Sequence, residues 1–579
     1  MLHYTPPSQD LAFILNDVLD ANAVLSALPR YNGVSTDVLL QIADEAGRFA
    51  AEQVLPLNHA ADQSGCTWEN GKVQTPPGFK QAYAKYCELG WPSMCADEAD
   101  GGQALPRLVF SITNEILSAA SHAFVMYAAI HHCASACLRH SATESLQRRW
   151  LPLLATGEVT SSMCMTEPHA GSDIGLLTTR AEPTPDGSYL ISGQKIFASG
   201  GDHDLTENIA HLVLARIAGA PSGSRGLSLF LVPKILDDGQ PNPIFCDGIE
   251  HKMGLHGSAT CSLRFESARG WLVGEPNKGL AAMFPMMNEA RLLSGLQALG
   301  ISDLAFQNAL AYAQDRRQGR AANKGQPAPI IHHPDVQRML LTQKAFIEGG
   351  RTFVHWVALL IDQADWATDA QTRQDTTDLV GLLTPIIKGF LTENAQTCTY
   401  NALQVFGGHG FIAETGIEQL VRDVRVTTIY EGTTSIQAHD LLTRKVLADD
   451  GRRLGLLLDN IRDWATSQAT EHACFIEAAL NTAAKLEAAT QLLATRYSED
   501  TELTLQASVA YLRLAGHSVL AYVWARNAVA AAQAPAASLW HKAKIETARF
   551  YVEQLLPEVD QLMAAIQAPA RPWADALAA

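Results

Sequence analysis

A strand-rich segment, residues 161–275, interrupts an otherwise helical chain, and this arrangement constrains the fold more than any other feature. Inside the segment, His211–Ile217, Leu227–Val232 and Cys261–Phe265 have the composition of strands, and Asp186-Gly187 is a hairpin signal. Outside it, apolar residues recur at helical spacing. Because 579 residues exceed what a single hydrophobic core serves, several domains are expected. We predict a mostly α protein with a central β domain.

The helical parts fall into three regions. At the start, Leu11 and Ile14 share a helix face behind Asp10, which we take as an N-cap, and a second helix runs from Thr36 to its end at Pro56. Long helices with few turn residues follow the β segment and are separated by a polar break at 321–334. Further apolar stripes continue after residue 450. We predict four domains: an N-terminal helical domain with an N-terminal extension (1–160), a middle β domain (161–275), a helical bundle (276–450) and an additional C-terminal helical domain (451–579).

The charge balance narrows the classes of partner. A formal net charge of -17 disfavours general binding to nucleic acid or to anionic lipid. No window is apolar for the length of a membrane helix, so no transmembrane segment is expected, and the first residues lack the pattern of a signal peptide. Ten scattered cysteines fit reduced thiols. These features favour a cytoplasmic protein.

Cys133 and Cys137, next to His131 and His132, could be drawn as a metal site. Small apolar cysteines on the buried face of a helix explain the spacing more simply. We therefore expect no metal.

The turn Ile429-Tyr430-Glu431-Gly432-Thr433 carries the strongest chemical signal. A carboxylate in a tight, Gly-containing turn can be held in one position and partly shielded from water, as a general base requires. Taken alone, such a glutamate is as often structural or solvated. Two upstream segments change that balance: Met163-Cys-Met-Thr-Glu-Pro-His-Ala-Gly-Ser-Asp173 and Gln404-Val-Phe-Gly-Gly-His-Gly-Phe411.

These three segments, in this order, resemble the acyl-CoA dehydrogenase family of flavoenzymes over roughly residues 35–445. The resemblance implies a helical N-terminal domain, a small β-barrel and a helical bundle. The segment 251–261, the break at 321–334 and the C-terminal domain are similar to the bacterial subfamily of 3-methylmercaptopropionyl-CoA and fatty acyl-CoA dehydrogenases, which carries an extra C-terminal helical domain.

The resemblance implies FAD as the cofactor and assigns its contacts. The first motif and the strand around Phe197 and Ser199 (Trp and Thr in many relatives) would meet the flavin ring. Arg316 and the glycine-rich loop would complete the FAD site of a neighbouring subunit, so a homodimer or a dimer of dimers is expected. A solvated helix end is the alternative explanation of Arg316, and Gly319 stands where relatives have an aromatic. The assigned residues are Met163, Met165, Thr166, Ser172, Phe197, Ser199, Arg316, Gln404, Gly407, Gly408, Thr433 and Ser435.

The resemblance also implies the reaction. Glu431 would remove the α-proton of an acyl-CoA thioester while the β-hydrogen leaves as hydride to flavin N5, which gives the trans-2-enoyl-CoA. The backbone N–H of Glu431 and a ribityl hydroxyl would stabilise the enolate oxygen. An electron-transferring flavoprotein would accept the electrons. The expected substrate-binding residues are Ser172, Arg291, Tyr430 and Gly432.

Several alternatives remain open. Arg291 could form an ion pair on a helix surface, and His256 could be a second catalytic group or a loop histidine that caps a strand. An acyl-CoA oxidase shares the half-reaction but returns electrons to O2. A flavin-binding, nucleic-acid-associated relative would need a basic surface, and the C-terminal domain has no Lys/Arg cluster. A catalytically silent scaffold would not need the intact glutamate and flavin segments.

Overall fold

The computed structural model describes residues 2–320, 327–468, 472–534 and 538–577. The chain forms two compact units: unit 1 combines Met1–Asp44 with Ser294–Ala579, and unit 2 is Glu45–Leu293. Helices α3 (Thr36–Phe49) and α10 (Gly279–Asp315) run from one unit into the other. The predicted fold class, mostly α with a central β domain, is confirmed. The division into four domains stays a prediction.

In the described part of unit 2, seven strands form one sheet whose pairings close on themselves. Strand β6 pairs with β4 and β7, β4 with β5, and β5 with β9, which returns to β7. The three predicted strands are confirmed within β6, β7 and β9, and the Asp186-Gly187 turn joins β4 to β5. The strands are β3 (Val159–Cys164), β4 (Arg180–Pro183), β5 (Tyr189–Ser199), β6 (Asn208–Ile217), β7 (Leu227–Pro233), β8 (Ile244–Ile249) and β9 (Thr260–Val273).

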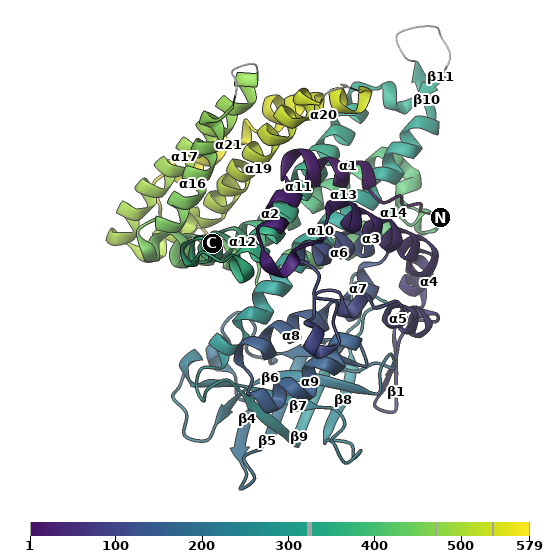
Figure 1. Cartoon of the computed structure of the whole chain (residues 1–579), viewed down its shortest axis with the longest axis vertical. Coiled ribbons are helices and arrows are strands. Elements are labelled where there is room, and N and C mark those ends of the chain that lie inside the picture. The colour runs from purple at the N-terminus through teal and green to yellow at the C-terminus, as the bar shows by residue number, and fades with distance from the viewer. Residues whose placement is uncertain (1, 321–326, 469–471, 535–537, 578–579) are drawn as a thin grey trace. The chain divides into compact units, whose positions relative to one another are not determined.

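Helices of unit 2 cover this sheet, with α8 and α9 packed on β3 (Figure 1). The expected helix end at Pro56 is wrong, because Pro56 stands in the first turn of α4 after a π-helical turn, η3 (Ala50–Val54). A proline is tolerated there since that N–H has no helical partner anyway. The hairpin of β1 (Thr67–Glu69) and β2 (Lys72–Gln74) was not predicted. The helices are α4 (Leu55–Ser64), α5 (Phe79–Glu88), α6 (Arg107–Ala120), α7 (His122–Ala128), α8 (Ile130–Ser141) and α9 (Glu144–Thr156).

Unit 1 is helical, and its C-terminal helices α16, α17, α19 and α21 lie side by side (Figure 1). A π-helical turn, η9 (Ile387–Leu391), stands between α12 and α13. The longer helices are α10, α11 (Pro334–Trp366), α12 (Ala370–Ile386), α13 (Thr392–Phe406), α16 (Arg452–Thr466), α17 (Ala473–Glu499), α19 (Ser508–Gln533), α20 (Leu539–Phe550) and α21 (Glu558–Gln567). The shorter ones are α1 (Ser8–Phe13), α2 (Ala21–Ser26), α14 (Ile417–Val424), α15 (Thr434–His439), α18 (Thr501–Thr504) and α22 (Ala574–Leu577).

Asp10 is not the N-cap of the first helix, as the sequence suggested. It lies inside α1, after the N-cap Pro7, and its buried carboxylate bonds to Lys544 and, at 2.7 Å, to Arg351. Burial favours the neutral acid, but the two cations hold the pKa of Asp10 below its ordinary value. The carboxylate therefore joins the N-terminal helix to α11 and α20. Its partners are hundreds of residues away, beyond any local pattern.

A second hairpin, which begins just before the expected polar break, was missed. Strand β10 (Arg317–Arg320) pairs with β11 (Pro327–Pro329), and residues 321–326 of the break lie outside the described part of the chain. Cys133 and Cys137 are buried on α8, and the Cys137 thiol donates to the carbonyl of Ala282. Over the described ranges, no helix is long and apolar enough to cross a membrane.

Candidate active site

The Glu431 turn lies between the 3-10 helix η12 (Arg425–Thr428) and α15. Glu431 has φ +55° and Gly432 has φ +89°. Left-handed backbone suits glycine but is strained for glutamate, and such strain persists only where the surroundings enforce it. Backbone of this kind clusters at active sites, so the geometry of this turn is itself a functional signal.

Buried donors enforce the turn. The Lys388 ammonium on η9 donates to the carbonyl of Gly432 at 2.6 Å, and the Gln437 amide on α15 donates to the carbonyl of Glu431 at 2.8 Å. Both side chains are 0 % exposed. Neither residue was predicted for the site, although a lysine inside the apolar run 385–391 is a signal that could have found Lys388.

Tyr430, predicted to contact substrate, has its hydroxyl tied to Gln297 on α10. Burial raises the pKa of Tyr430, and the neighbouring Glu431 carboxylate raises it further. The hydroxyl is therefore a neutral donor that anchors the turn. Thr433 and Ser435, predicted to contact the flavin, pair with each other at 3.2 Å just past the glutamate.

In unit 2, the two predicted flavin segments lie together. The N–H of Ile196 donates to the carbonyl of Thr166 at 2.9 Å, which joins the loop after β3 to the irregular part of β5. Phe197 has φ +57° and is 57 % exposed. A strained backbone that turns an aromatic ring outward is typical of a ligand-binding position. Met163, Met165 and Ser199 are half-buried nearby in sequence, while Ser172 is exposed.

A buried ion pair supports this loop. Glu167 accepts a bond from Lys195 at 2.9 Å, and it also accepts four bonds from the backbone and hydroxyls of Thr178 and Thr179. Lys195 donates in addition to the carbonyl of Met165. Burial alone would raise the pKa of Glu167, but the Lys195 charge and these bonds lower it to about 2. Neither residue was predicted for the site, although Glu167 stands inside the first quoted motif and Lys195 lies two residues before Phe197.

Arg316 and the glycine-rich loop also lie together, in unit 1. Arg316 follows the last residue of α10, where Tyr312 stacks on Phe406 at 4.3 Å and its hydroxyl pairs with His409 at 2.9 Å. Gln404 in the last turn of α13, and Gly407 and Gly408 just after it, are exposed. At Gly319, which has a left-handed φ of +71°, a Cβ atom would stand 2.9 Å from the His333 ring, so any larger residue would have to displace that ring.

The residues present fit FAD. A Cβ built on Gly171, Gly407 or Gly408 would meet no atom within 4 Å, so the backbone is open to the close approach of a phosphate or ribose. Thr166 and Ser199 supply hydroxyls, Phe197 an exposed ring, and Arg316 a guanidinium. The unit 2 residues therefore suit a flat, hydrogen-bonding ring, and the unit 1 residues taken by themselves suit phosphates.

The structure also shows the surroundings of Arg291 and His256, for which two roles each were considered. Arg291 is 4 % exposed on α10, so it lies in the interior and not on the helix surface. His256 has both ring nitrogens engaged, Nδ1 with Asp62 at 3.0 Å and Nε2 with the carbonyl of Lys252 at 2.8 Å. These contacts favour a histidine that fastens its own loop over a second catalytic group.

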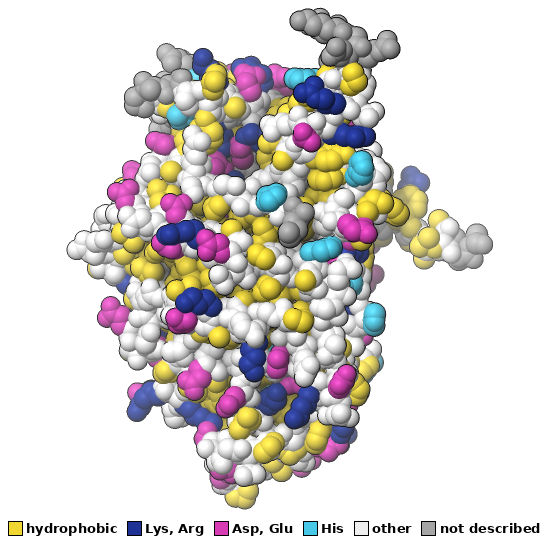
Figure 2. All heavy atoms as spheres, turned by 90° about the vertical axis from the view of Figure 1, so that its right-hand side faces the viewer, with side chains coloured by type: hydrophobic (Ala, Val, Ile, Leu, Met, Phe, Trp, Pro, Cys, Tyr) yellow, Lys and Arg dark blue, Asp and Glu magenta, His cyan; other side chains and the backbone are white. Residues whose placement is uncertain are grey.

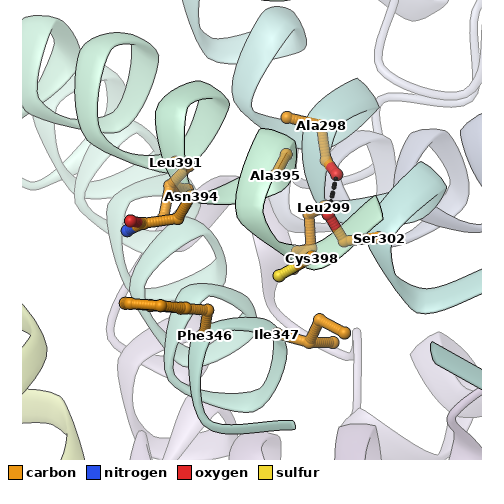
Figure 3. Close-up of a pocket in the computed structure, with 9 residues that line it drawn as sticks. All are labelled: Ala298, Leu299, Ser302, Phe346, Ile347, Leu391, Asn394, Ala395 and Cys398. Atoms are coloured by element: carbon orange, nitrogen blue, oxygen red, sulfur yellow. Dashed lines mark hydrogen bonds between the residues drawn. The ribbon is translucent and has the colours of Figure 1, made fainter. Parts of the chain in front are cut away.

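A small pocket of about 10 Å³ lies between α10, α11 and α13 of unit 1, and none of its lining residues was predicted for the site (Figure 3). Its lining is mainly apolar, and the Ser302 hydroxyl donates a hydrogen bond to the carbonyl of Ala298 at 2.7 Å. Burial raises the pKa of the Cys398 thiol to about 12. A protonated thiol is a poor nucleophile, so this pocket offers no reactive group.

Comparison with known proteins agrees with the geometry. Family models match residues 36–158, 162–268 and 277–446, described as the N-terminal, middle and C-terminal domains of acyl-CoA dehydrogenase. A fourth model, acetyl-CoA dehydrogenase C-terminal like, matches residues 457–576.

Relatives of similar length match along nearly the whole chain. The 3-methylmercaptopropionyl-CoA dehydrogenase of Ruegeria pomeroyi is 38 % identical, with 96 % of each chain covered. The broad-specificity linear acyl-CoA dehydrogenase FadE5 of Mycobacterium tuberculosis is 35 % identical with the same coverage. The solved structure of a Bacillus anthracis acyl-CoA dehydrogenase complexed with FAD has the same fold, with a TM-score of 0.77 over 97 % of this chain and 92 % of that one at 20 % identity. This protein belongs to the acyl-CoA dehydrogenase family of FAD-dependent oxidoreductases.

Proposed function

We propose that this protein dehydrogenates an acyl-CoA thioester between its α and β carbons to give the trans-2-enoyl-CoA, with FAD as the cofactor. The observation that carries the proposal is the Glu431 carboxylate, presented from a strained left-handed turn that buried donors hold in place. A fixed carboxylate is suited to abstract an α-proton.

Each residue then has a defined task. Glu431 accepts the α-proton at a carboxylate oxygen, and its backbone N–H donates to the thioester oxygen as negative charge develops there. Such a donor is worth about 3 kcal/mol in the transition state. When bound, FAD supplies the acceptor for the β-hydride. Thr166, Ser199 and Phe197 hold its ring, while Arg316 and the loop at Gly407 hold its phosphates. Arg291 orients the thioester arm of the substrate.

Anaerobic bleaching of the flavin band tests the reaction. We expect the FAD-loaded protein to bleach with at least one acyl-CoA from a panel of butyryl-CoA, longer linear acyl-CoAs and 3-methylmercaptopropionyl-CoA. The panel follows the relatives, which are named for butyryl, linear and methylmercapto substrates. FAD-loaded protein that bleaches with none of them would contradict the dehydrogenase assignment.

The electron acceptor is proposed to be an electron-transferring flavoprotein, in the cytoplasm. The rival reading, an acyl-CoA oxidase, requires fast reoxidation of the reduced flavin by O2. We expect reduced enzyme to persist in air-saturated buffer and to be reoxidised quickly when an electron-transferring flavoprotein is added. Rapid reoxidation by air alone would favour the oxidase.

The surface charge disfavours the nucleic-acid-associated alternative. On the face drawn in Figure 2, Lys and Arg side chains are scattered among Asp and Glu and do not gather into one basic patch. The net charge of the whole chain is -17. Binding to a phosphate backbone depends on clustered cations, so a small anionic substrate is the better supported ligand.

We also propose that FAD is shared between subunits of a homodimer or of a dimer of dimers. Arg316, Gln404, Gly407 and Gly408 lie at one exposed end of unit 1, and Tyr400 and Phe411 in the same stretch are 63 % and 84 % exposed. Exposed aromatics next to ligand residues suit a subunit interface.

Subunit mixing tests this sharing. Arg316→Ala is expected to lose FAD affinity because a bidentate, permanently charged group is removed from the phosphates. Mixed with Glu431→Gln protein under subunit exchange, it should regain activity, since one of the two sites in each mixed dimer keeps both residues. No recovery, with exchange proven by mass spectrometry, would show that each site is built within one chain.

A further inference from the structure

Lys388 is a buried cation in the interior of unit 1. It lies on η9, the π-helical turn between α12 and α13, and it is 0 % exposed. Other π-helical turns occur in the described chain, η3 among them, so the turn does not distinguish this residue. A lysine in an apolar interior is costly unless its ammonium is bound. The burial of the ammonium therefore calls for a specific role.

The ammonium reaches the turn that carries the proposed base. Lys388 Nζ donates to the carbonyl of Gly432 at 2.6 Å. In addition, Gln437 Nε2 on α15 donates to the carbonyl of Glu431 at 2.8 Å and approaches that of Gly432 at 3.4 Å. Bonds from a charged donor are shorter and stronger than neutral ones. Two consecutive carbonyls are thus held by donors from two different helices.

The bonds from Lys388 and Gln437 act on the two residues whose backbone is left-handed. Glu431 and Gly432 both have left-handed φ, and a Cβ atom on Gly432 would meet Gln437 Nε2 at 2.8 Å. A residue with a side chain at position 432 would therefore crowd the Gln437 amide that bonds to the turn. Without the two donors, Glu431 is free to return to ordinary right-handed backbone, which redirects its side chain.

We propose that Lys388 is a positioning residue for Glu431: its ammonium, bound to the carbonyl of Gly432, holds the left-handed turn that aims the carboxylate. The proposal rests on the proposed function, in which Glu431 is the base. It assigns Lys388 no contact with substrate or FAD. Its effect is on the placement of the base, where a shift of about 1 Å can cost about 10²-fold in rate.

The first test is Lys388→Met, which keeps the length of the side chain and removes the ammonium. We expect FAD content and acyl-CoA affinity to be nearly unchanged, while stopped-flow flavin reduction slows about 10²-fold. Lys544→Met is the matched control, because Lys544 is an equally buried ammonium in the same unit but bonds to Asp10 and Glu348. The control should lose stability and keep the reduction rate of its folded, FAD-loaded fraction.

A double variant separates positioning from a general structural role. If Lys388 acts through Glu431, Lys388→Met should hardly lower the residual rate of Glu431→Gln protein. Propylamine added to Lys388→Ala should restore part of the reduction rate, since it returns an ammonium to the space. Should Lys388→Met fail to fold, Gln437→Leu carries the same test by removing the other donor.

Three results would overturn the proposal: a wild-type reduction rate in folded Lys388→Met, equal losses with and without Glu431, or a rate loss in Lys544→Met as large as in Lys388→Met. A wild-type rate in Glu431→Gln itself would instead refute the proposed function. The two failures are therefore distinguishable.

Discussion

Glu431→Gln protein is expected to bind FAD and acyl-CoA and yet fail to reduce the flavin. The amide is nearly isosteric with the carboxylate, so the left-handed turn and the backbone N–H donor survive. What disappears is the ability to accept the α-proton. Loss of a general base costs roughly 10²–10⁴-fold, and we expect the upper end because hydride departure depends on proton removal.

Stopped-flow absorbance after mixing with acyl-CoA measures this loss. Glu414→Gln is a suitable control, since Glu414 is an exposed glutamate in the 3-10 helix η11 (Ala413–Thr415) between the glycine-rich loop and the turn. It should bleach at the wild-type rate. Bleaching of Glu431→Gln within about tenfold of wild type, far less than removal of a general base costs, would identify some other group as the base.

Lys195→Met is expected to destabilise unit 2 and to disturb the flavin. Lys195 is 0 % exposed and Glu167 2 % exposed, and removing one partner of such a pair leaves an uncompensated buried charge, which costs about 3–5 kcal/mol. The lysine also holds the Met165 carbonyl, so the loop carrying Thr166 loses an anchor. We expect a lower midpoint in urea and a shifted visible spectrum of any bound FAD.

The pH dependence checks the same pair. In the folded protein the pKa of Glu167 is lowered to about 2, so the unfolded chain binds the proton more readily. Its contribution, about 3 kcal/mol, is full above the ordinary pKa of the group and is lost as the pH falls toward 2. Lys195→Met should lose much of this acid-side dependence. The double variant Lys195→Met/Glu167→Gln leaves no unpaired buried charge, so it should recover part of the stability. Unchanged urea midpoints in both variants would show that the pair does not support the loop.

Local sequence pattern was sufficient to predict elements that depend on residue periodicity, turn residues and short motifs. The strands within β6, β7 and β9, the turn at Asp186-Gly187 and the long helices of unit 1 follow from periodicity and turn residues. The motif order also supported the family assignment. Glu431 could be singled out because a glutamate beside glycine in a short turn is visible in the sequence itself.

Buried charges and strained backbone were decided by the tertiary structure. Asp10 reads as a helix cap, yet Arg351 and Lys544 make it a buried ion-pair partner. Lys388 reads as one lysine in an apolar helix, yet its ammonium reaches a carbonyl 44 residues away. Helical and strand periods report only which face of an element is apolar. The partner that makes a buried ammonium or a left-handed glutamate tolerable is set by packing between distant segments, so it exists only once the chain has folded.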